Sequence, residues 1–298
     1  MGVTGLRFLG HDVTQEEVEL IREVVTSCDG LSRIELANTV CELLGWTRRS
    51  GLVKGRECRE FLEKLEIEGV LVLPAKRAGR PVGKQTEVPV TQRGEPGEEL
   101  VTSAGELGRI EVELVRTDEA RRLFRELVGR YHYLGHAVPF GAQLRYLVYS
   151  SSPERTLVGC IQFSSPAWRI AVRDQWIGWD DVSRARNLQH VVSNSRYLLL
   201  PWIQVKNLAS RVLSKAVRQM AMDWQEHYAV EPLLVETLVD PTRFRGTCYR
   251  AANWIELGRT SGQARVYRQR KRIEVAPKIV LIYPLVRNAV HRLRGDQG

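Results

Sequence analysis

The sequence predicts a two-part α/β protein, in which a small helical unit precedes a larger domain built on a mixed sheet flanked by helices. Two observations lead to this fold class. Residues 195–201 and 233–240 are short apolar runs typical of buried strands, and residues 207–228 between them have the period of a long helix. A strand, a helix and a strand in this order predict a βαβ unit with parallel strands and a right-handed crossover. Residues 75–109, which are poor in large apolar side chains, separate the two parts as a basic linker.

The composition is that of an ordinary globular protein. Of the 298 residues, 43% are hydrophobic and 27% are charged. No apolar run approaches the roughly 20 residues of a membrane span, and the first residues lack the apolar core of a signal peptide. We therefore expect a cytoplasmic protein without membrane contact. The five cysteines show no paired spacing, so neither a disulfide framework nor a metal site is predicted.

Positive charge is concentrated toward the C-terminus. The chain has a net charge of +9, and residues 265–298 hold nine Lys or Arg against two acidic residues. A concentrated basic surface is typical of a protein that binds a polyanion. A solvated basic tail is the other interpretation.

The N-terminal unit, residues 11–74, is predicted to contain three helices and a strand. Two capping-box spacings mark the starts of the first two helices: Thr14 with Glu17, and Ser32 with Glu35. A third helix is expected over residues 55–68, and an apolar strand over residues 69–74. This order resembles a winged helix-turn-helix.

In that motif the third helix faces DNA, so its basic side chains are expected to contact phosphates. They are Lys54, Arg56 and Arg59. Acidic residues alternate with them along the same helix, and a surface that contacts another protein is therefore the alternative.

The second domain, residues 110–288, is predicted to alternate strands and helices, and a basic tail, residues 289–298, follows it. The expected strands are residues 110–115, 143–150, 156–163, 195–201, 233–240, 255–258 and 278–284. The expected helices are residues 118–131, 180–191 and 207–228, with a short helix after residue 240.

This order of elements, together with Tyr249, Asn253 and a strand ending at Gly258, resembles the GNAT acyltransferase fold. The resemblance implies that an acyl-CoA-like donor binds where the long helix begins, because amides at a helix N-terminus bind phosphate oxygens. The residues that it assigns to the donor are Lys206, Asn207, Ser210 and Asn253. The turn before the helix lacks the glycines of that family, so the cofactor stays undefined.

Several longer phrases resemble the Druantia A family, which is named for a component of a bacterial anti-phage system. They are Arg130–Gly135, Trp176–Asp180, Asn194–Tyr197, Asn207–Ser210 and Arg243–Trp254. The resemblance implies a defence or mobile-element setting, contact with DNA, and a helicase or another defence protein as partner. It does not imply a particular reaction.

Three residues are candidates for acid–base chemistry. They are His132, whose type titrates near neutrality, Glu236, which is a carboxylate in an apolar strand, and Tyr249, which matches the proton donor of the GNAT fold. A salt bridge from Glu236 to Arg243 or Arg245 is the structural alternative. Nucleic-acid contacts are expected from Lys54, Arg56, Arg59, Trp176, Trp179, Asn194, Arg196, Arg243, Arg245 and Trp254.

Three functions stay open at this point. The first is transfer of an acyl-type group to a nucleobase. The second is catalytically silent DNA recognition on behalf of a helicase or nuclease partner. The third is a metal-dependent nuclease or transposase that uses Glu236 and Asp240 with Asp180 or Asp181.

Overall fold

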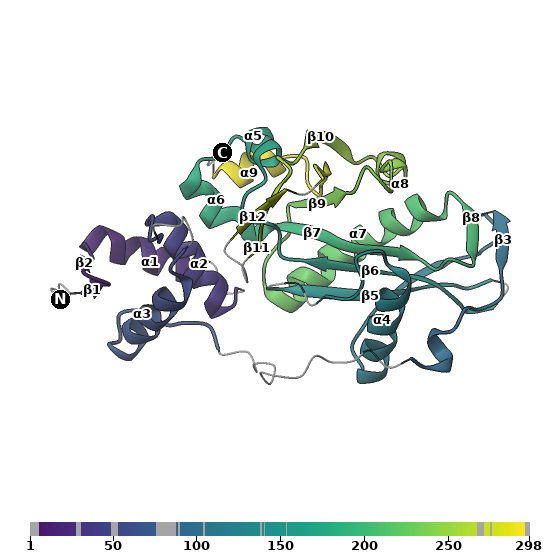
Figure 1. Cartoon of the computed structure of the whole chain (residues 1–298), viewed down its shortest axis with the longest axis horizontal. Coiled ribbons are helices and arrows are strands. Elements are labelled where there is room, and N and C mark those ends of the chain that lie inside the picture. The colour runs from purple at the N-terminus through teal and green to yellow at the C-terminus, as the bar shows by residue number, and fades with distance from the viewer. Residues whose placement is uncertain are drawn as a thin grey trace.

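The computed structural model shows the N-terminal unit and the larger α/β domain side by side (Figure 1). It describes residues 6–27, 31–48, 53–75, 88, 90–103, 105–137, 139, 141–152, 154–266, 271–274 and 276–295, with the backbone alone for residues 263–266 and 271–274. Part of the basic C-terminal segment thus lies outside the described residues. No helix in the described ranges is both long and apolar enough to cross a membrane.

Three helices form the N-terminal unit: α1 (Gln15–Ser27), α2 (Arg33–Leu43) and α3 (Gly55–Ile67). A two-residue hairpin of β1 (Arg7–Phe8) and β2 (His11–Asp12) precedes them. Both predicted capping boxes form, with reciprocal bonds between Thr14 and Glu17 and between Ser32 and Glu35. The three predicted helices are therefore confirmed.

The strand expected over residues 69–74 does not form within the described chain. This segment is extended without a strand partner, and it buries Leu71 and Leu73 against the three helices. The apolar run is explained by this packing instead of by pairing in a sheet. A winged helix-turn-helix is accordingly not shown.

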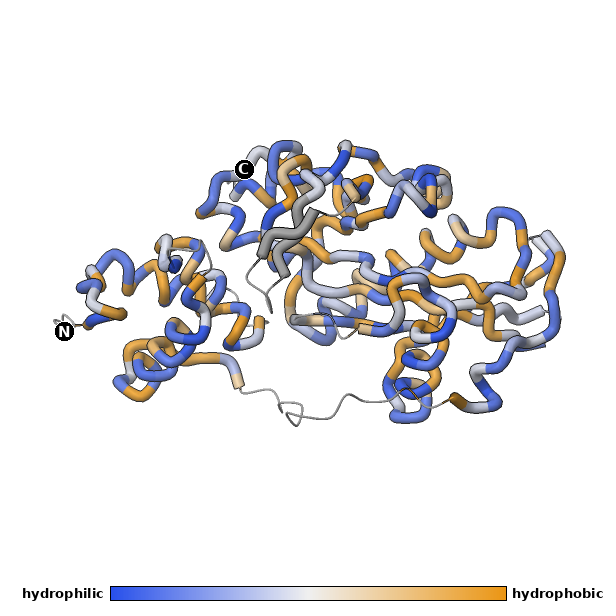
Figure 2. Tube along the Cα trace, in the orientation of Figure 1, coloured by the Kyte–Doolittle hydropathy of each residue, from blue (hydrophilic) through white to orange (hydrophobic). Residues whose placement is uncertain are grey.

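A seven-stranded mixed sheet forms the larger domain, in the order β10-β13-β9-β7-β6-β5-β4. Among the neighbouring strands of this sheet, only β7 and β9 run parallel, as the βαβ prediction requires. The strands are β4 (Ile110–Leu114), β5 (Gln143–Ser150), β6 (Thr156–Ser164), β7 (Val191–Leu199), β9 (Leu234–Val239), β10 (Ile255–Arg259) and β13 (Ile279–Pro284). Hydrophobic residues run along the inner strands (Figure 2).

Two long helices, α4 (Asp118–Tyr131) and α7 (Leu208–Tyr228), cover opposite faces of the sheet. Neighbouring residues of β5 show this, because Arg145 lies over Phe124 of α4 while the Tyr146 hydroxyl bonds Asp223 of α7. The shorter helices are α5 (Ala171–Ile177), α6 (Asp181–Asn187), α8 (Thr247–Ala251) and α9 (Ala289–Arg294), with 3-10 turns η1 (Gln92–Gly94) and η2 (Leu188–His190). A hairpin of β11 (Gln263–Val266) and β12 (Lys271–Glu274) lies beside them.

Three predicted boundaries are wrong. The linker contains β3 (Leu100–Ser103), which pairs in parallel with β8 (Ile203–Lys206), where a polar turn was expected. Strand β7 begins at Val191, inside the helix expected over residues 180–191. The tail forms α9, because Leu293 is fully buried against the domain.

The N-terminal unit docks on α6 and η2 (Figure 1). Glu23 of α1 forms an ion pair with Arg186 at 2.6 Å, and the Gln189 amide donates to the Ser27 carbonyl. Both contacts are polar and exposed. They fix which face of the unit meets the α/β domain.

Candidate nucleic-acid interface

The two parallel strands part toward their carboxyl ends. Strands β7 and β9 pair only from Val191 to Asn194 and from Leu234 to Thr237. Strand β7 then continues to Leu199, and its register on β6 shifts beyond Asn194. Open α/β sheets bind ligands beyond the carboxyl ends of such strands.

A buried polar network forms a floor where the pairing of the two strands ends. The Tyr249 hydroxyl of α8 donates to Asn194 Oδ1 at 2.7 Å, and Thr237 Oγ1 donates to the Asn194 carbonyl at 3.1 Å. The Asn194 amide donates to the Gln162 carbonyl at 3.1 Å. All these side chains are almost fully buried. The network therefore joins β6, β7, β9 and α8. Its hydrogen bonds account for a polar side chain at Asn194 without a nucleic-acid contact.

Above this floor, aromatic and basic side chains from three segments meet. We call His132, Tyr133, Arg196, Arg243 and Phe244 the Tyr133 cluster. The Tyr133 ring stacks on His132 at 4.9 Å and contacts the Phe244 ring at 5.4 Å, between ring centroids. The Arg243 guanidinium lies over Tyr133, 5.2 Å from its centroid.

Arg196 of β7 fixes the segment after α4, because its Nε donates to the Gly135 carbonyl at 3.1 Å. Outward from it, Arg243 and Arg245 are exposed, and the Phe244 side chain is 52% exposed. The cluster thus combines packed aromatic rings with arginine side chains that face solvent.

The electrostatics of the cluster keep its imidazole neutral. Burial, together with the charge of Arg196, lowers the pKa of His132 to about 4. Its Nδ1 accepts from the Leu134 amide at 3.2 Å. Burial also raises the pKa of Tyr133. At neutral pH His132 is therefore a weak base and an uncharged ring, which suits stacking better than the predicted acid–base role.

Glu236 is held in an internal ion pair. Its Oε2 accepts from Arg173 Nη1 at 2.9 Å, and both side chains are 0% exposed. Arg173 also contacts Asp174 at 2.7 Å. Burial raises the pKa of Glu236, although Arg173 opposes the shift. The salt bridge expected to Arg243 or Arg245 is formed by Arg173 instead, and this geometry does not favour acid–base work by Glu236.

The carboxylates of the nuclease alternative are dispersed. Asp180 caps α6 by accepting from the Ser183 amide at 2.7 Å, and Asp240 accepts from Thr242. Among the residues described, no group of three or more His, Cys, Asp or Glu is placed to hold a metal ion. Within those residues, Asp180, Asp181, Glu236 and Asp240 therefore do not form such a group.

The predicted tryptophans are mostly structural. Trp254 packs against Tyr249 and Tyr283, and Trp179 donates to Asp174 Oδ1 at 3.1 Å; both are buried. Trp176 packs partly buried against the core around Ile177. Burial leaves little of the Trp179 and Trp254 rings for a base to stack on.

The residues assigned to a donor lie beside the start of α7 and the end of α8. Lys206 and Asn207 precede α7, and Asn207 has a left-handed backbone with φ of 64° and no side-chain cap bond. The Ser210 hydroxyl donates to the Asn207 carbonyl at 3.1 Å. Asn253, exposed and also left-handed at φ 64°, follows α8, which contacts α7.

Acidic neighbours accompany the basic residues of α3. Arg56 pairs with Glu60 at 3.1 Å and Arg48 pairs with Glu57, while Lys54 lies over the Phe8 ring at 5.8 Å. Arg59 is half-buried. Residues 1–75 contain 9 Lys or Arg against 13 Asp or Glu, a net charge of −4, whereas residues 110–298 contain 29 against 17, a net charge of +12. The positive field of the chain therefore belongs to the α/β domain.

Sequence reasoning found Arg196 and Arg243 but did not assign roles to Tyr133, Phe244 or Arg173. A usable signal existed for Phe244, which stands between two arginines after a strand end. Arg173 had no such signal, because its partner Glu236 is 63 residues away.

Solved structures similar to this chain include two acetyltransferases. Spermidine N-acetyltransferase from Vibrio cholerae, in complex with CoA and spermine, has 8% identity and a TM-score of 0.37 over 59% of this chain and 95% of that chain. Aminoglycoside acetyltransferase AAC(6')-Ib, in complex with coenzyme A, has 15% identity and a TM-score of 0.36 over 62% and 99%. Both are similarities of fold alone.

Sequence comparison is more specific. Druantia protein DruA from Escherichia coli (strain UMEA 4076-1) is 42% identical over 53 residues, which are 18% of this chain and 13% of that protein. The family model described as Druantia protein DruA matches residues 64–274, well over half of the chain. The chain therefore belongs to the DruA family.

Proposed function

We propose that this chain binds DNA that has unpaired bases, and that the Tyr133 cluster is the contact surface. The observation that carries the proposal is the meeting of three rings and two guanidinium groups at the parted ends of β7 and β9. Unpaired bases stack on aromatic side chains, whereas arginines neutralise the phosphates between them.

The chemistry of each member suits this role. Phe244 is exposed and offers an apolar face, and Arg243 and Arg245 flank it in the sequence. The neutral His132 supports Tyr133 from behind. The net charge of +12 on the surrounding domain attracts a polyanion over longer distances.

On this proposal the N-terminal unit is not the DNA-contacting part. Arg56 of its third helix pairs with Glu60, Glu57 of the same helix pairs with Arg48, and the net charge of the unit is negative. A partner protein is the better fit for its exposed face. We place the chain, through its family, in an anti-phage defence setting, with a helicase or another defence protein as that partner.

Fluorescence anisotropy with a labelled single-stranded oligonucleotide tests the proposal. Phe244→Ala is expected to weaken binding by about 1–3 kcal/mol, the value of one stacked base. Arg243→Ala is expected to weaken binding and to reduce the slope of log K against log salt by about 1. Arg169→Ala is the matched control, because Arg169 is exposed and pairs with Asp181 at 2.6 Å, away from the cluster. Equal binding by all three variants would contradict the proposal.

Acyl transfer to a nucleobase stays a second candidate. The observation that favours it is that β7 and β9 stop pairing after Asn194 and Thr237, while Lys206 and Asn207 stand just before α7. Tyr249 is the remaining proton-donor candidate, and its hydroxyl donates to Asn194 Oδ1 where this pairing ends. Mass spectrometry of nucleosides from expressing cells checks it: a modified base lost with Tyr249→Phe supports transfer, and unmodified nucleosides with wild type contradict it.

A further inference from the structure

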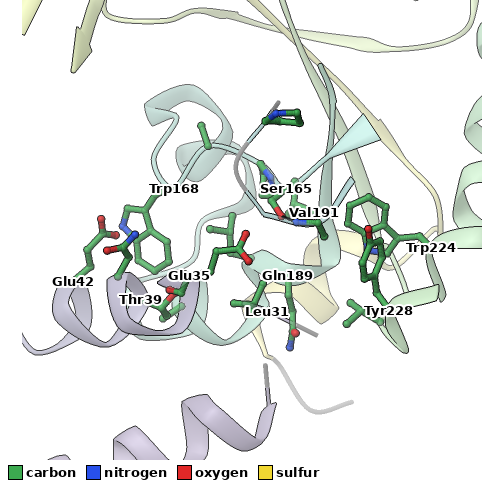
Figure 3. A pocket seen from close by; sticks show the side chains of 18 of the residues that line it. Leu31, Glu35, Thr39, Glu42, Ser165, Trp168, Gln189, Val191, Trp224 and Tyr228 are labelled. Atoms are coloured by element: carbon green, nitrogen blue, oxygen red, sulfur yellow. Dashed lines mark hydrogen bonds between the residues drawn. The ribbon is translucent and has the colours of Figure 1, made fainter. Parts of the chain in front are cut away.

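A cavity of about 720 Å³ lies between the N-terminal unit and the α/β domain (Figure 3). Its walls come from α2, from the segment before α5, from α6 and η2, and from the end of α7. Val191, the first residue of β7, lines it, so it lies at the opposite end of the parallel strands from the Tyr133 cluster. Its volume falls within the range of small-molecule sites, roughly 300–1,000 Å³.

Aromatic side chains stand on two sides of the cavity. Trp168 lies on one side, and Trp224 and Tyr228 lie on the other (Figure 3). The two rings of α7 pack together at 4.8 Å between centroids. The Arg184 guanidinium lies over the Trp168 ring at 5.1 Å and helps to hold it. Such walls favour a planar ligand.

The polar groups of the cavity include one donor and one acceptor without partners. Trp168 Nε1 is buried and has no acceptor, and Gln189 Oε1 is buried and has no donor. The Glu35 carboxylate uses Oε2 to cap α2 through the Ser32 amide at 2.8 Å. Its Oε1 lies so close to Gly141 that a Cβ there would be at 1.7 Å. The carboxylate is therefore held at the junction of the two parts.

The charge of the lining disfavours an anionic ligand beside Glu35. Within the described part of the chain, the lining residues include the Glu35 carboxylate but no Lys, Arg or His. A phosphate next to Glu35 would be repelled by this carboxylate. The ligand that fits is a neutral or cationic heteroaromatic ring with N–H donors for a carboxylate and an acceptor for the indole N–H.

We propose that this cavity binds a purine base, with guanine as the best match. Glu35 accepts from the adjacent N1–H and N2–H of guanine, and Trp168 Nε1 donates to a ring acceptor. This site is separate from the Tyr133 cluster, so the inference goes beyond the proposed function and stands without it.

The buried ion pair between Glu236 of β9 and Arg173 supports one wall of this cavity. Arg173 donates to the Ala167 carbonyl at 2.8 Å and to the Trp168 carbonyl at 3.0 Å, while Glu236 holds Arg173 from below. The pair thus positions the backbone that carries the indole. Glu236 acts here as a positioning residue.

Isothermal titration of the full chain with guanosine and with inosine tests the proposal, since inosine lacks the N2 amine. Wild type is expected to bind guanosine more tightly than inosine. Glu35→Gln, which keeps the capping box, is expected to weaken guanosine by about 10- to 100-fold and to remove the difference between the two nucleosides. Trp168→Phe is expected to weaken the binding of both nucleosides. Guanosine monophosphate is expected to bind no better than guanosine.

Glu60→Gln and Trp176→Phe are the matched controls, because neither residue lines the cavity. Arg243→Ala is expected to keep guanosine affinity, which separates this site from the DNA surface. Absence of saturable guanosine binding by wild type overturns the proposal. Equal guanosine affinity in wild type, Glu35→Gln and Trp168→Phe, with unchanged melting temperatures, overturns it as well.

Discussion

Two charged side chains in the core of this fold are explained by the ion pair that they form with each other. Arg173 and Glu236 are both 0% exposed, and each has the other as its countercharge across 2.9 Å. A buried charge that loses its partner is far more costly than a surface pair. The pair is therefore a structural feature of the sheet, even though an isolated glutamate in an apolar strand has the sequence pattern of a catalytic residue.

Arg173→Leu is expected to lower the free energy of unfolding by about 3–5 kcal/mol, because it leaves the Glu236 carboxyl buried in the core without its partner. Adding Glu236→Leu to that variant is expected to recover part of the loss. Urea unfolding followed by circular dichroism measures both. Arg169→Leu, at an exposed pair, should stay within about 0.5 kcal/mol of wild type. A similarly small effect of Arg173→Leu would show that the ion pair is not essential.

His132 makes stability depend on pH in a defined direction. Its folded pKa of about 4 lies below the ordinary value of 6.5, so the unfolded chain binds more protons between these two values. Stability from this group is present above pH 6.5 and is lost as the pH falls toward 4. The loss stays below about 3 kcal/mol, since the ring is partly exposed and solvent screens it.

Unfolding free energies of wild type and His132→Gln, measured from pH 7 to pH 4, check this. The difference between the two proteins should shift in favour of the variant as the pH falls. A difference that does not change with pH would mean that the imidazole is not held neutral in the folded protein.

At the scale of elements, the start of α7 depends on the backbone conformation of one residue. Asn207 is left-handed at φ 64°, a region that Asn and Gly tolerate and β-branched residues do not. Asn207→Val is expected to destabilise the protein by about 1–3 kcal/mol, while Asn207→Gly is expected to change stability by less than about 1 kcal/mol. Thermal unfolding of both variants measures this. Equal losses would assign the effect to the lost side chain instead.

Elements with local signals could be predicted, and elements that depend on distant partners could not. Helix α4 occupies Asp118–Tyr131 as expected, because its cap and apolar period are local. Strands β3 and β8 were missed, since each is a four-residue segment with only two large apolar residues that becomes a strand by pairing with the other, about 100 residues away. The start of β7 was missed because polar residues such as Ser193 and Asn194 interrupt its apolar run.

The same distinction holds for the candidate site. Arg243 could be named because polar residues beyond the carboxyl end of a strand are a general signal. The placement of Tyr133 against Phe244, 111 positions further along the chain, could not be predicted, because it requires the end of α4 to meet the loop after β9. Burial removed Trp254 and Trp179 from the site, and no pattern in the sequence distinguishes a buried tryptophan from an exposed one.

At the scale of the whole molecule, charge divides the chain into two parts. An acidic unit with a net charge of −4 docks on a domain with a net charge of +12, and the ion pair between Glu23 and Arg186 lies at the junction. Arg186→Glu is expected to raise hydrogen exchange in α1 and α6 by a few-fold, in line with the roughly 0.2–1 kcal/mol of an exposed pair.

The charge-swapped chain, Glu23→Arg with Arg186→Glu, is expected to return that exchange toward the wild-type rate. Hydrogen exchange read by mass spectrometry gives the measurement for both. If hydrogen exchange in α1 is as fast in the charge-swapped chain as in Arg186→Glu, the ion pair does not guide the docking of the two parts.

The central claim is that DNA contacts the α/β domain at the Tyr133 cluster and not the third helix of the N-terminal unit. Photo-crosslinking of the full chain to a single-stranded oligonucleotide that contains 5-bromouracil, followed by peptide mass spectrometry, tests it most directly. The account predicts crosslinks on peptides that contain Tyr133 or Phe244. Crosslinks confined to α3 (Gly55–Ile67) would contradict it.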